Sequence, residues 1–522
     1  MQESVRRGPS LDGEFRYLEP SFFGLVDAKV MPNDRVADRS RSSFRAEHDG
    51  ALPYDAFVQL RVLRVSDDDY WKDFPGEIKS LTPRLLQTDL QVARPFGNWS
   101  TYARAMRWQV LQTEDPTTRI ISPYERAPQI GTRYAGPWRG GFDVGFEAEF
   151  NRFANPDDRF LVERQTGVRT HALGSIARPF ISPGWTVTPK VSFNAASYSL
   201  DLPLADGRTT TSRVIPTVSI DSAWTLERET ELFGRTVRQT LEPRLFYVNT
   251  PYRRQDLVPN FDSAPKDFNF DSLFTENQFS GVDRVSDSNQ LSAGVISRVL
   301  DPETGAEALR VGLAQRYRYS DQRVTPDGVP LTQRFSDVLI FGSTNLVPRW
   351  NFDTAVQFNP DSHRIERSLA GMRYTPGPYR TVGLTYRLTR GLSEQVELGW
   401  QWPIYGPGRD GERGERAATG SGSGCGGTLY GVGHLNYSTR DSRLTDSIVG
   451  LEYDAGCWIG RVVVERLSTG RSEATTRLLL QLELVGLSRI GSNPLRVLKD
   501  NVPGYQLLRE ERTTITPFTP YD

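Results

Sequence analysis

Alternation of apolar and polar side chains with a period of two runs through long stretches of this chain. In residues 141–150, GFDVGFEAEF, the side chains of Phe142, Phe146 and Phe150 fall on one face and that of Glu147 on the other. The same alternation recurs in residues 185–193, 395–402 and 478–484. A period of two is that of a β-strand whose two faces meet different surroundings. The pattern therefore predicts an all-β protein.

Alternation alone also fits a soluble antiparallel sheet with one wet face. Three features favour a membrane barrel instead. Segments such as 184–200 run well beyond the roughly 5–6 residues typical of globular strands. Full charges lie on the polar face, and aromatic residues such as Trp185, Trp400 and Tyr453 stand near segment ends, as in an interfacial girdle. We predict a large antiparallel transmembrane β-barrel.

Composition narrows the function classes. Lys+Arg total 63 and Asp+Glu 64, so no basic excess indicates nucleic-acid binding. Four histidines and two cysteines give no zinc-type cluster and no disulfide framework, and no cofactor is predicted. No stretch reaches the roughly 18–20 consecutive apolar residues of a membrane helix. The first residues, MQESVRRGPSLDGEF, lack the apolar core of a signal peptide.

Turn signals such as TPGP at 375–378 divide the chain into about 23 strands between Glu14 and Gly486. We therefore predict an unstructured start at 1–13, a transmembrane β-barrel at 14–487 and a periplasmic C-terminal tail at 488–522. If the last strand runs inward, counting back by hairpins places the long connection near 250–290 outside the cell. A barrel of this size is too wide for side chains to fill, so a missing segment or a second protein must occupy the lumen.

Several motifs carry a family resemblance. They are TLEPR (240–244), PYR (251–253), GVDR (281–284), NQ (289–290), GVISR (294–298), EFRYL (14–18), SDDDYWKDF (66–74), VGLEYDAGCW (449–458), VVVER (462–466) and LRVLKDNVPGY (495–505). Together they resemble LptD, the lipopolysaccharide-assembly family of the Gram-negative outer membrane. The likeness covers nearly the whole chain, and the spacing from LEPR to GVISR is its most specific part.

The resemblance implies a barrel of about 26 strands that inserts lipopolysaccharide into the outer leaflet of the cell outer membrane. It implies an LptE-like plug lipoprotein in the lumen, and a periplasmic LptA-like bridge that reaches the barrel through an N-terminal jelly roll. It also implies a lateral seam between the first and last strands. EFRYL resembles the family's fourth strand or so, so we expect a fragment that lacks the jelly roll and the first strands. An open edge in lipid leaves backbone groups unpaired, and such a fragment should not assemble alone.

The cysteines depart from the family pattern, which commonly has two adjacent cysteines at the penultimate periplasmic turn, bonded to the N-terminal region. Here that turn holds Cys457 followed by Trp458, and Cys425 lies one periplasmic turn earlier. A spare thiol is not expected in an oxidising periplasm. Two disulfide arrangements follow: Cys425 with Cys457, or each with a cysteine that precedes this chain.

The 253–290 loop interleaves charged and aromatic residues. One interpretation is a folded lid, whose aromatic side chains form a small satellite core and in which Asp283 pairs with Arg284. The other is a moving cover that contacts phosphorylated sugar through Arg253, Arg254 and Arg284, since arginine binds phosphate in a bidentate fashion.

Two further sets of residues are candidates. By family likeness, the lip of the lateral gate is the last strand, with Leu478, Leu480, Leu482 and Leu484. The charged residues expected to face the lumen, where they would line water or contact the plug, are Glu147, Glu149, Lys190, Glu397, Arg461, Glu465 and Glu483.

No catalytic motif accompanies the four scattered histidines, so no enzyme activity is predicted. The alternative function is a passive porin or a ligand-gated outer-membrane transporter. It is disfavoured by the motif set.

Overall fold

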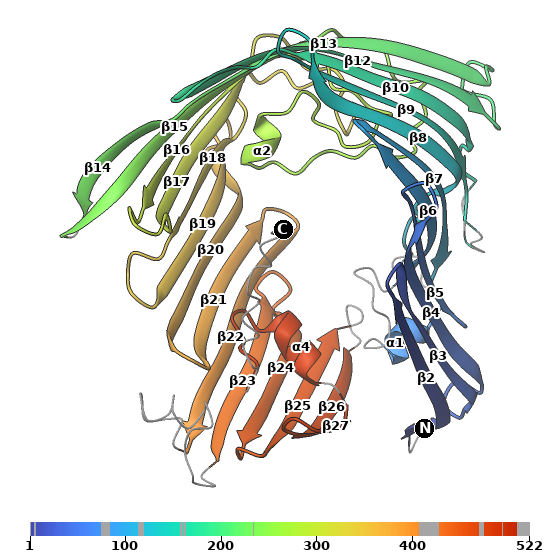
Figure 1. Ribbon diagram of the computed structural model, residues 1–522, viewed down its shortest axis with the longest axis vertical. Helices are drawn as coiled ribbons and strands as arrows, with labels where there is room; N and C mark the ends of the chain where they lie inside the picture. The colour runs from blue at the N-terminus through green and yellow to red at the C-terminus, as the bar shows by residue number, and fades with distance from the viewer. Residues whose placement is uncertain are drawn as a thin grey trace. The chain divides into compact units, whose positions relative to one another are not determined.

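The computed structural model describes most of the chain (Figure 1). The described residues are 2–4, 7–74, 84–112, 119–156, 160, 163–232, 234–406, 427–468, 474–492 and 494–508. Cys425 and the end of the predicted tail lie outside them. The chain divides into two compact units. The first comprises Met1–Trp224, Arg244–Ala293 and Arg316–Phe335, and the second comprises Thr225–Pro243, Gly294–Gln315 and Ser336–Asp522.

The first unit is built mostly from long antiparallel strands, and most of them pair with the next strand along the chain. Its strands are β1 (Gln2–Ser4), β2 (Gly8–Glu19), β3 (Phe22–Asp34), β4 (Arg39–Leu52), β5 (Ala56–Val65), β6 (Leu85–Phe96), β7 (Trp99–Val110), β8 (Glu125–Trp138), β9 (Phe142–Ala154), β10 (Gly167–Ala177), β11 (Phe180–Ser182), β12 (Trp185–Leu200) and β13 (Thr210–Trp224). Two helices of four residues, α1 (Tyr70–Asp73) and α2 (Phe270–Leu273), lie in its long connections.

Three strands contribute to both units: β15 (Arg235–Thr250), β16 (Ser288–Leu300) and β17 (Glu307–Arg318). The second unit adds β14 (Leu226–Leu232), β18 (Val338–Thr344), β19 (Trp350–Asn359), β20 (Arg364–Gly377), β21 (Arg380–Thr389), β22 (Ser393–Tyr405), β23 (Thr428–Ser438), β24 (Arg443–Asp454), β25 (Trp458–Ser468), β26 (Ala474–Leu484) and β27 (Ser488–Gly491). A helix, α4 (Pro494–Asn501), follows β27.

The predicted strand count is confirmed within the described part of the chain. β10 and β11 both pair with β12, and β13 and β14 both pair with β15, so each couple is one interrupted strand. Counted that way, and without the short β1 and β27, the 27 labelled strands give 23 long ones. The boundaries differ at both ends. Strand structure already begins by Gly8 rather than at 14, and the predicted tail contains β27 and α4.

Both units expose apolar side chains and bury polar ones, which reverses the arrangement of a soluble sheet. On β13, Val214 is 61% exposed and Val218 46%, whereas Arg213 is 7% exposed. On β25, Val462 is 47% exposed and Arg461 only 2%. An apolar outer band with charges on the opposite face is the arrangement of outer-membrane β-barrel strands. The predicted fold class, all-β and of the transmembrane-barrel type, is confirmed.

The buried apolar clusters form where connections fold back over the polar faces of the strands. One joins Phe153 and Tyr198 to Phe261 of the connection after β15, and another joins Tyr70 of α1 to Leu86. Within the described residues, no helix combines the length and the apolar character needed to cross a membrane.

Candidate functional site

The long connection after β15, residues 251–287, is a folded loop pinned to the first unit. Pro251 ends the strand because proline donates no ladder hydrogen bond. Within the loop, Asn269 caps the start of α2, and its side chain accepts from the Ser272 backbone N–H in a capping box. Gly281 has φ +68, and a Cβ there would lie 2.4 Å from the Asp262 carbonyl oxygen. Only glycine fits this turn without strain.

Asp283 is the main anchor of the loop. Its side chain is fully buried. Oδ1 accepts hydrogen bonds from Arg169 Nη1 of β10 and from the Tyr198 hydroxyl of β12, both at 2.8 Å. Oδ2 accepts from the backbone N–H groups of Phe261 at 2.6 Å and Asp262 at 3.0 Å. One carboxylate therefore ties two strands to the fold of the loop.

Arg169 is shared among several carboxylates. Besides Asp283, its guanidinium lies 2.7 Å from Asp262 Oδ2 and 3.4 Å from Glu149 Oε1, and its side chain is 1% exposed. Burial raises the pKa of the Asp283 carboxyl despite the attraction of Arg169. Burial also acts on Asp262, but Arg169 and the Val282 N–H outweigh it and lower the pKa of Asp262. The cluster is a buried ion network, in which removal of one partner leaves the others uncompensated.

Aromatic packing supports the same anchor. Phe261 stacks on Phe153 of β9 with ring centroids 4.3 Å apart, and the Tyr124 ring meets it edge-on at 5.2 Å. Phe274 and Phe279 are buried as well. The predicted satellite core exists, but it includes residues of the strands. The predicted pairing of Asp283 with Arg284 is wrong, since the Asp283 carboxylate binds Arg169.

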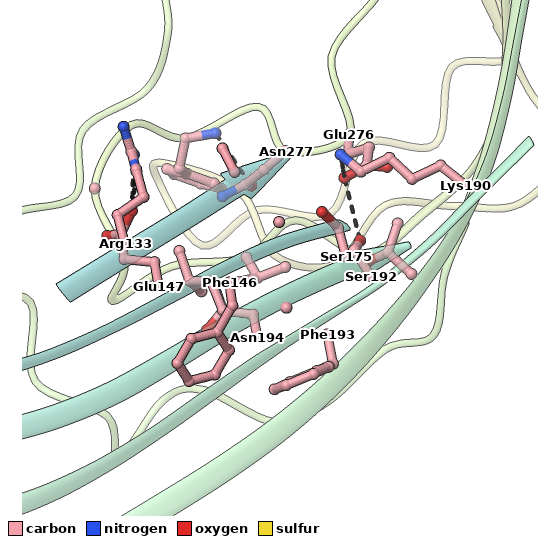
Figure 2. A pocket seen from close by; sticks show the side chains of 18 of the residues that line it. Arg133, Phe146, Glu147, Ser175, Lys190, Ser192, Phe193, Asn194, Glu276 and Asn277 are labelled. Carbon is pink, nitrogen blue, oxygen red and sulfur yellow. Dashed lines mark hydrogen bonds and ion pairs between the residues drawn. The ribbon is translucent and has the colours of Figure 1, made fainter. Parts of the chain in front are cut away.

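A second anchor closes a pocket under the loop (Figure 2). Glu276 accepts from the Ser219 hydroxyl at 2.6 Å and from Lys190 Nζ and the Ser192 hydroxyl, both at 3.2 Å. The pocket beside it has a volume of about 560 Å³ and lies between the polar faces of β8–β13 and the loop. Hydroxyl and amide groups line much of it, among them those of Ser175 and Asn194.

Positive charge predominates slightly in this pocket. Arg133 lies 2.7 Å from Glu147, and Lys190 pairs with Glu276. Lys266 contributes a third cation from the loop. Partial desolvation beside the pocket lowers the pKa of the Lys266 ammonium, although the side chain is exposed, and the attraction of Glu276 opposes this shift. The hydroxyl, amide and cationic groups suit the anionic part of a ligand, while Phe146, Phe193 and Phe279 give the pocket apolar surface as well.

The three arginines predicted to contact phosphate lie in different surroundings. Arg253 is exposed, and Arg254 forms an exposed pair with Asp256 at 3.0 Å. Arg284 is partly buried and donates to the Pro259 carbonyl at 3.1 Å. Burial lowers the pKa of its guanidinium. The structure does not bring the three together, and their contact with phosphate stays a prediction.

The residues expected to face the lumen lie on the polar faces. Glu149, Arg461 and Glu465 are buried, and the others are partly buried. Glu149 accepts from the Tyr102 hydroxyl at 2.5 Å and from Gln129 Nε2 at 2.6 Å. Glu397 lies 3.2 Å from His434 Nε2. Most of these charges are therefore engaged with neighbours of their own unit.

The strand expected to be last is followed by another. Leu478, Leu480 and Leu482 of β26 are exposed and Leu484 is partly buried. β27 then folds back and pairs with β26 from Gln481 to Leu484. β26 is thus not the last strand, and its role as a gate lip stays a prediction.

The structure describes one of the two cysteines. Cys457 is exposed, and no disulfide partner for it lies among the described residues. Cys425 lies outside the described residues, so neither predicted disulfide arrangement is tested.

Sequence reasoning missed the residues that hold the loop. Arg169, Tyr198 and Arg213 were not singled out, although each stands on the polar face of an alternating strand. Arg213 donates to the Val282 carbonyl oxygen. The period of two predicts the face of the strand on which each of them lies. It does not predict which residues of the loop they contact.

An antiparallel all-β chain with outward apolar stripes and buried charges belongs to the class of outer-membrane β-barrel proteins. A family model described as LptD, LPS transport system D, matches residues 39–405. The chain is 47% identical to the LPS-assembly protein LptD of Polaromonas sp., over 99% of this chain and 64% of that protein. It is 45% identical to the protein of that name from Albidiferax ferrireducens (99% and 65%) and 37% identical to that from Ralstonia nicotianae (99% and 62%).

The chain belongs to the LptD family. It spans somewhat less than two-thirds of the length of these relatives.

Proposed function

We propose that this chain forms the membrane part of an outer-membrane translocon that inserts lipopolysaccharide into the outer leaflet. The observation that carries the proposal is the alignment of 99% of the chain with relatives named LPS-assembly protein. The exposed apolar stripes on β13 and β25 are consistent with strands immersed in lipid. On this proposal the 251–287 loop lies outside the cell and the turn with Cys457 lies in the periplasm.

The partners follow from the same proposal. An LptE-like lipoprotein plugs the lumen and contacts the polar face, where Lys190 and Glu397 retain partial exposure. A periplasmic LptA-like bridge delivers the lipid. The 251–287 loop is the outer cover of the lumen, and the side chains of Asp283 and Glu276 hold it to the strands. The buried ion network around Arg169 supports a cover that stays closed until a ligand offsets its contacts.

The lateral seam between the first and last strands is part of the proposal. Pairing of β26 with β27 runs from Gln481 to Leu484, and Ser492 extends it by hydrogen bonds to the backbone of Leu480. The remaining part of the edge of β26, from Ala474 to Leu479, would face the seam. An edge strand with a short partner is more stable in lipid than one with no partner, because each backbone group left without a hydrogen bond is costly there.

Depletion of the protein in its host tests the proposal. Lipopolysaccharide at the cell surface, measured with a membrane-impermeant reagent on intact cells, should fall on depletion and return on re-expression. A lipoprotein and lipopolysaccharide should co-purify with the tagged protein. Undiminished surface lipopolysaccharide, together with open-channel conductance in planar bilayers, would refute the proposal and favour a porin.

A further inference from the structure

The segment after β27 is not a free tail but lies against the strands of its own unit. We call residues 494–508 the strap. Leu498 and Val502 of the strap pack on Val432, Ile448 and Val463. These strand residues alternate with exposed ones such as Val449, Val462 and Val464. The strap therefore lies on the face of β23–β25 opposite the exposed apolar side chains. Figure 1 shows its helix α4 against these strands.

Polar contacts fix the strap at one position along the strands. The Gln401 amide of β22 donates to the Gln506 carbonyl and accepts from the Gln506 N–H, both at 2.9 Å. The Gln506 side chain accepts from the Tyr379 N–H at 2.8 Å. At Gly399, a Cβ would lie 2.9 Å from Pro503 Cδ, so a side chain there would push the strap away. These contacts give the strap a defined position against the strands of its unit.

One hydrogen-bond chain leads from the strap across three strands. The Tyr505 hydroxyl donates to Glu452 Oε1 of β24 at 2.7 Å. Arg461 of β25 donates to the same oxygen from Nε at 2.9 Å. Arg461 Nη1 then donates to Gln481 Oε1 at 3.0 Å and to Glu483 Oε2 at 2.5 Å, both on β26.

The members of this chain are nearly all shielded from solvent. Glu452 and Arg461 have almost no exposed surface, and Glu483 is 14% exposed. Burial raises the pKa of the Tyr505 hydroxyl, which keeps it a donor at neutral pH. Charge-assisted hydrogen bonds in such surroundings are stronger and more geometrically defined than those between neutral groups.

We propose that the strap is a positioning element for β26, with Tyr505 as the positioning residue that acts through Glu452 and Arg461. This hydrogen-bond chain ends on Gln481 and Glu483, in the part of β26 that also pairs with β27. The strap thus holds this part in place and confines any opening of the β26 edge to Ala474–Leu479, since the backbone of Leu480 is already bonded to Ser492. This inference rests on the proposed function, since it assigns a hinge to the proposed seam.

Spin labels on the lipid-facing side of β26 test the strap. The complete protein with its lipoprotein partner is placed in bilayers, and a nitroxide is attached at position 482, 478 or 451. Tyr505→Phe removes only the hydroxyl donor. It should raise the mobile fraction at 482 roughly tenfold, as expected for loss of one hydrogen bond to a charged group. The spectra at 478 and 451 should stay unchanged.

The matched control is Arg496→Ala. Arg496 lies on the exposed side of α4 and forms a long 3.5 Å contact with exposed Asp500, so its removal should alter no label. Leu498→Ala is a second variant, which weakens the packing of the strap and should act in the same direction as Tyr505→Phe. Heat-modifiable migration on gels verifies that each variant is folded.

Equal mobility changes at 451, 478 and 482 would show general loosening and overturn the proposal, as would no change in either strap variant. Surface lipopolysaccharide in cells carrying the wild-type protein is measured separately. Its absence would refute the proposed function, whereas the mobility ratio between 482 and 478 tests the strap in either case.

Discussion

Asp283→Asn tests the idea that one carboxylate fastens the 251–287 loop. The change keeps the shape of the side chain but turns one acceptor oxygen into a donor NH₂. In one orientation the amide faces the N–H groups of Phe261 and Asp262, and in the other it faces Arg169 and Tyr198. Either way two of the four hydrogen bonds are lost.

The magnitude follows from these contacts. A buried donor left without a partner costs about 1–3 kcal/mol. Loss of one partner from a buried ion pair costs about 3–5 kcal/mol, but Arg169 keeps Asp262 at 2.7 Å, so the full value is not expected. We expect the docking free energy of the loop to fall by about 3 kcal/mol, which raises the undocked population roughly 100-fold.

Hydrogen exchange measured by mass spectrometry on the purified protein reports this population. Amides such as Val282 and Val285, which donate to Asp262 and Gln255, should exchange roughly 100-fold faster in Asp283→Asn if they exchange through undocking. Arg254→Ala is the control, because its pair with Asp256 is about 70% exposed on both sides and exposed pairs contribute about 0–1 kcal/mol. Unchanged loop protection in Asp283→Asn would refute the reasoning. An equal acceleration of hydrogen exchange in β10 and β12 would show that Asp283 stabilises the surrounding strands as well as the docked loop.

Three further outcomes are expected. Gly281→Ala should undock the loop as Asp283→Asn does, since a Cβ would meet the Asp262 carbonyl; wild-type hydrogen exchange would contradict this. Leu480→Arg should destabilise the folded protein in bilayers by about 2–4 kcal/mol, measured by urea unfolding, because the side chain is exposed where lipid is proposed; a neutral effect would argue for an aqueous surface. Lys266 is exposed and should react faster than Lys499 with an acylating ester at pH 8, because partial desolvation lowers its pKa and enlarges the neutral fraction; equal rates would mean that its ammonium is fully hydrated.

The candidate site was only partly readable from the sequence. The GVDR motif entered the sequence analysis only as part of the family resemblance, and the structure shows that it holds the turn at Gly281 and the anchor Asp283. The three arginines predicted to contact phosphate lie apart, since Arg253 and Arg254 are exposed and Arg284 donates to loop carbonyls. Their contact with phosphate stays a prediction. The pocket itself was not predicted, because its floor comes from β8–β13 and its roof from residues far along the chain.

The strands, their approximate number and the face on which each side chain lies can be predicted from the sequence alone. A period of two is local, so Val462 and Arg461 are assigned to opposite faces without any knowledge of neighbours. Which charged side chains form ion pairs depends on the tertiary structure. Arg169 and Asp283 are 114 residues apart, and their pairing depends on the path of the loop over the sheet. The sequence predicts a tail where the structure has the strap, for the same reason. The residues that the strap contacts lie on strands tens of residues earlier, and a local sequence pattern carries no information about them.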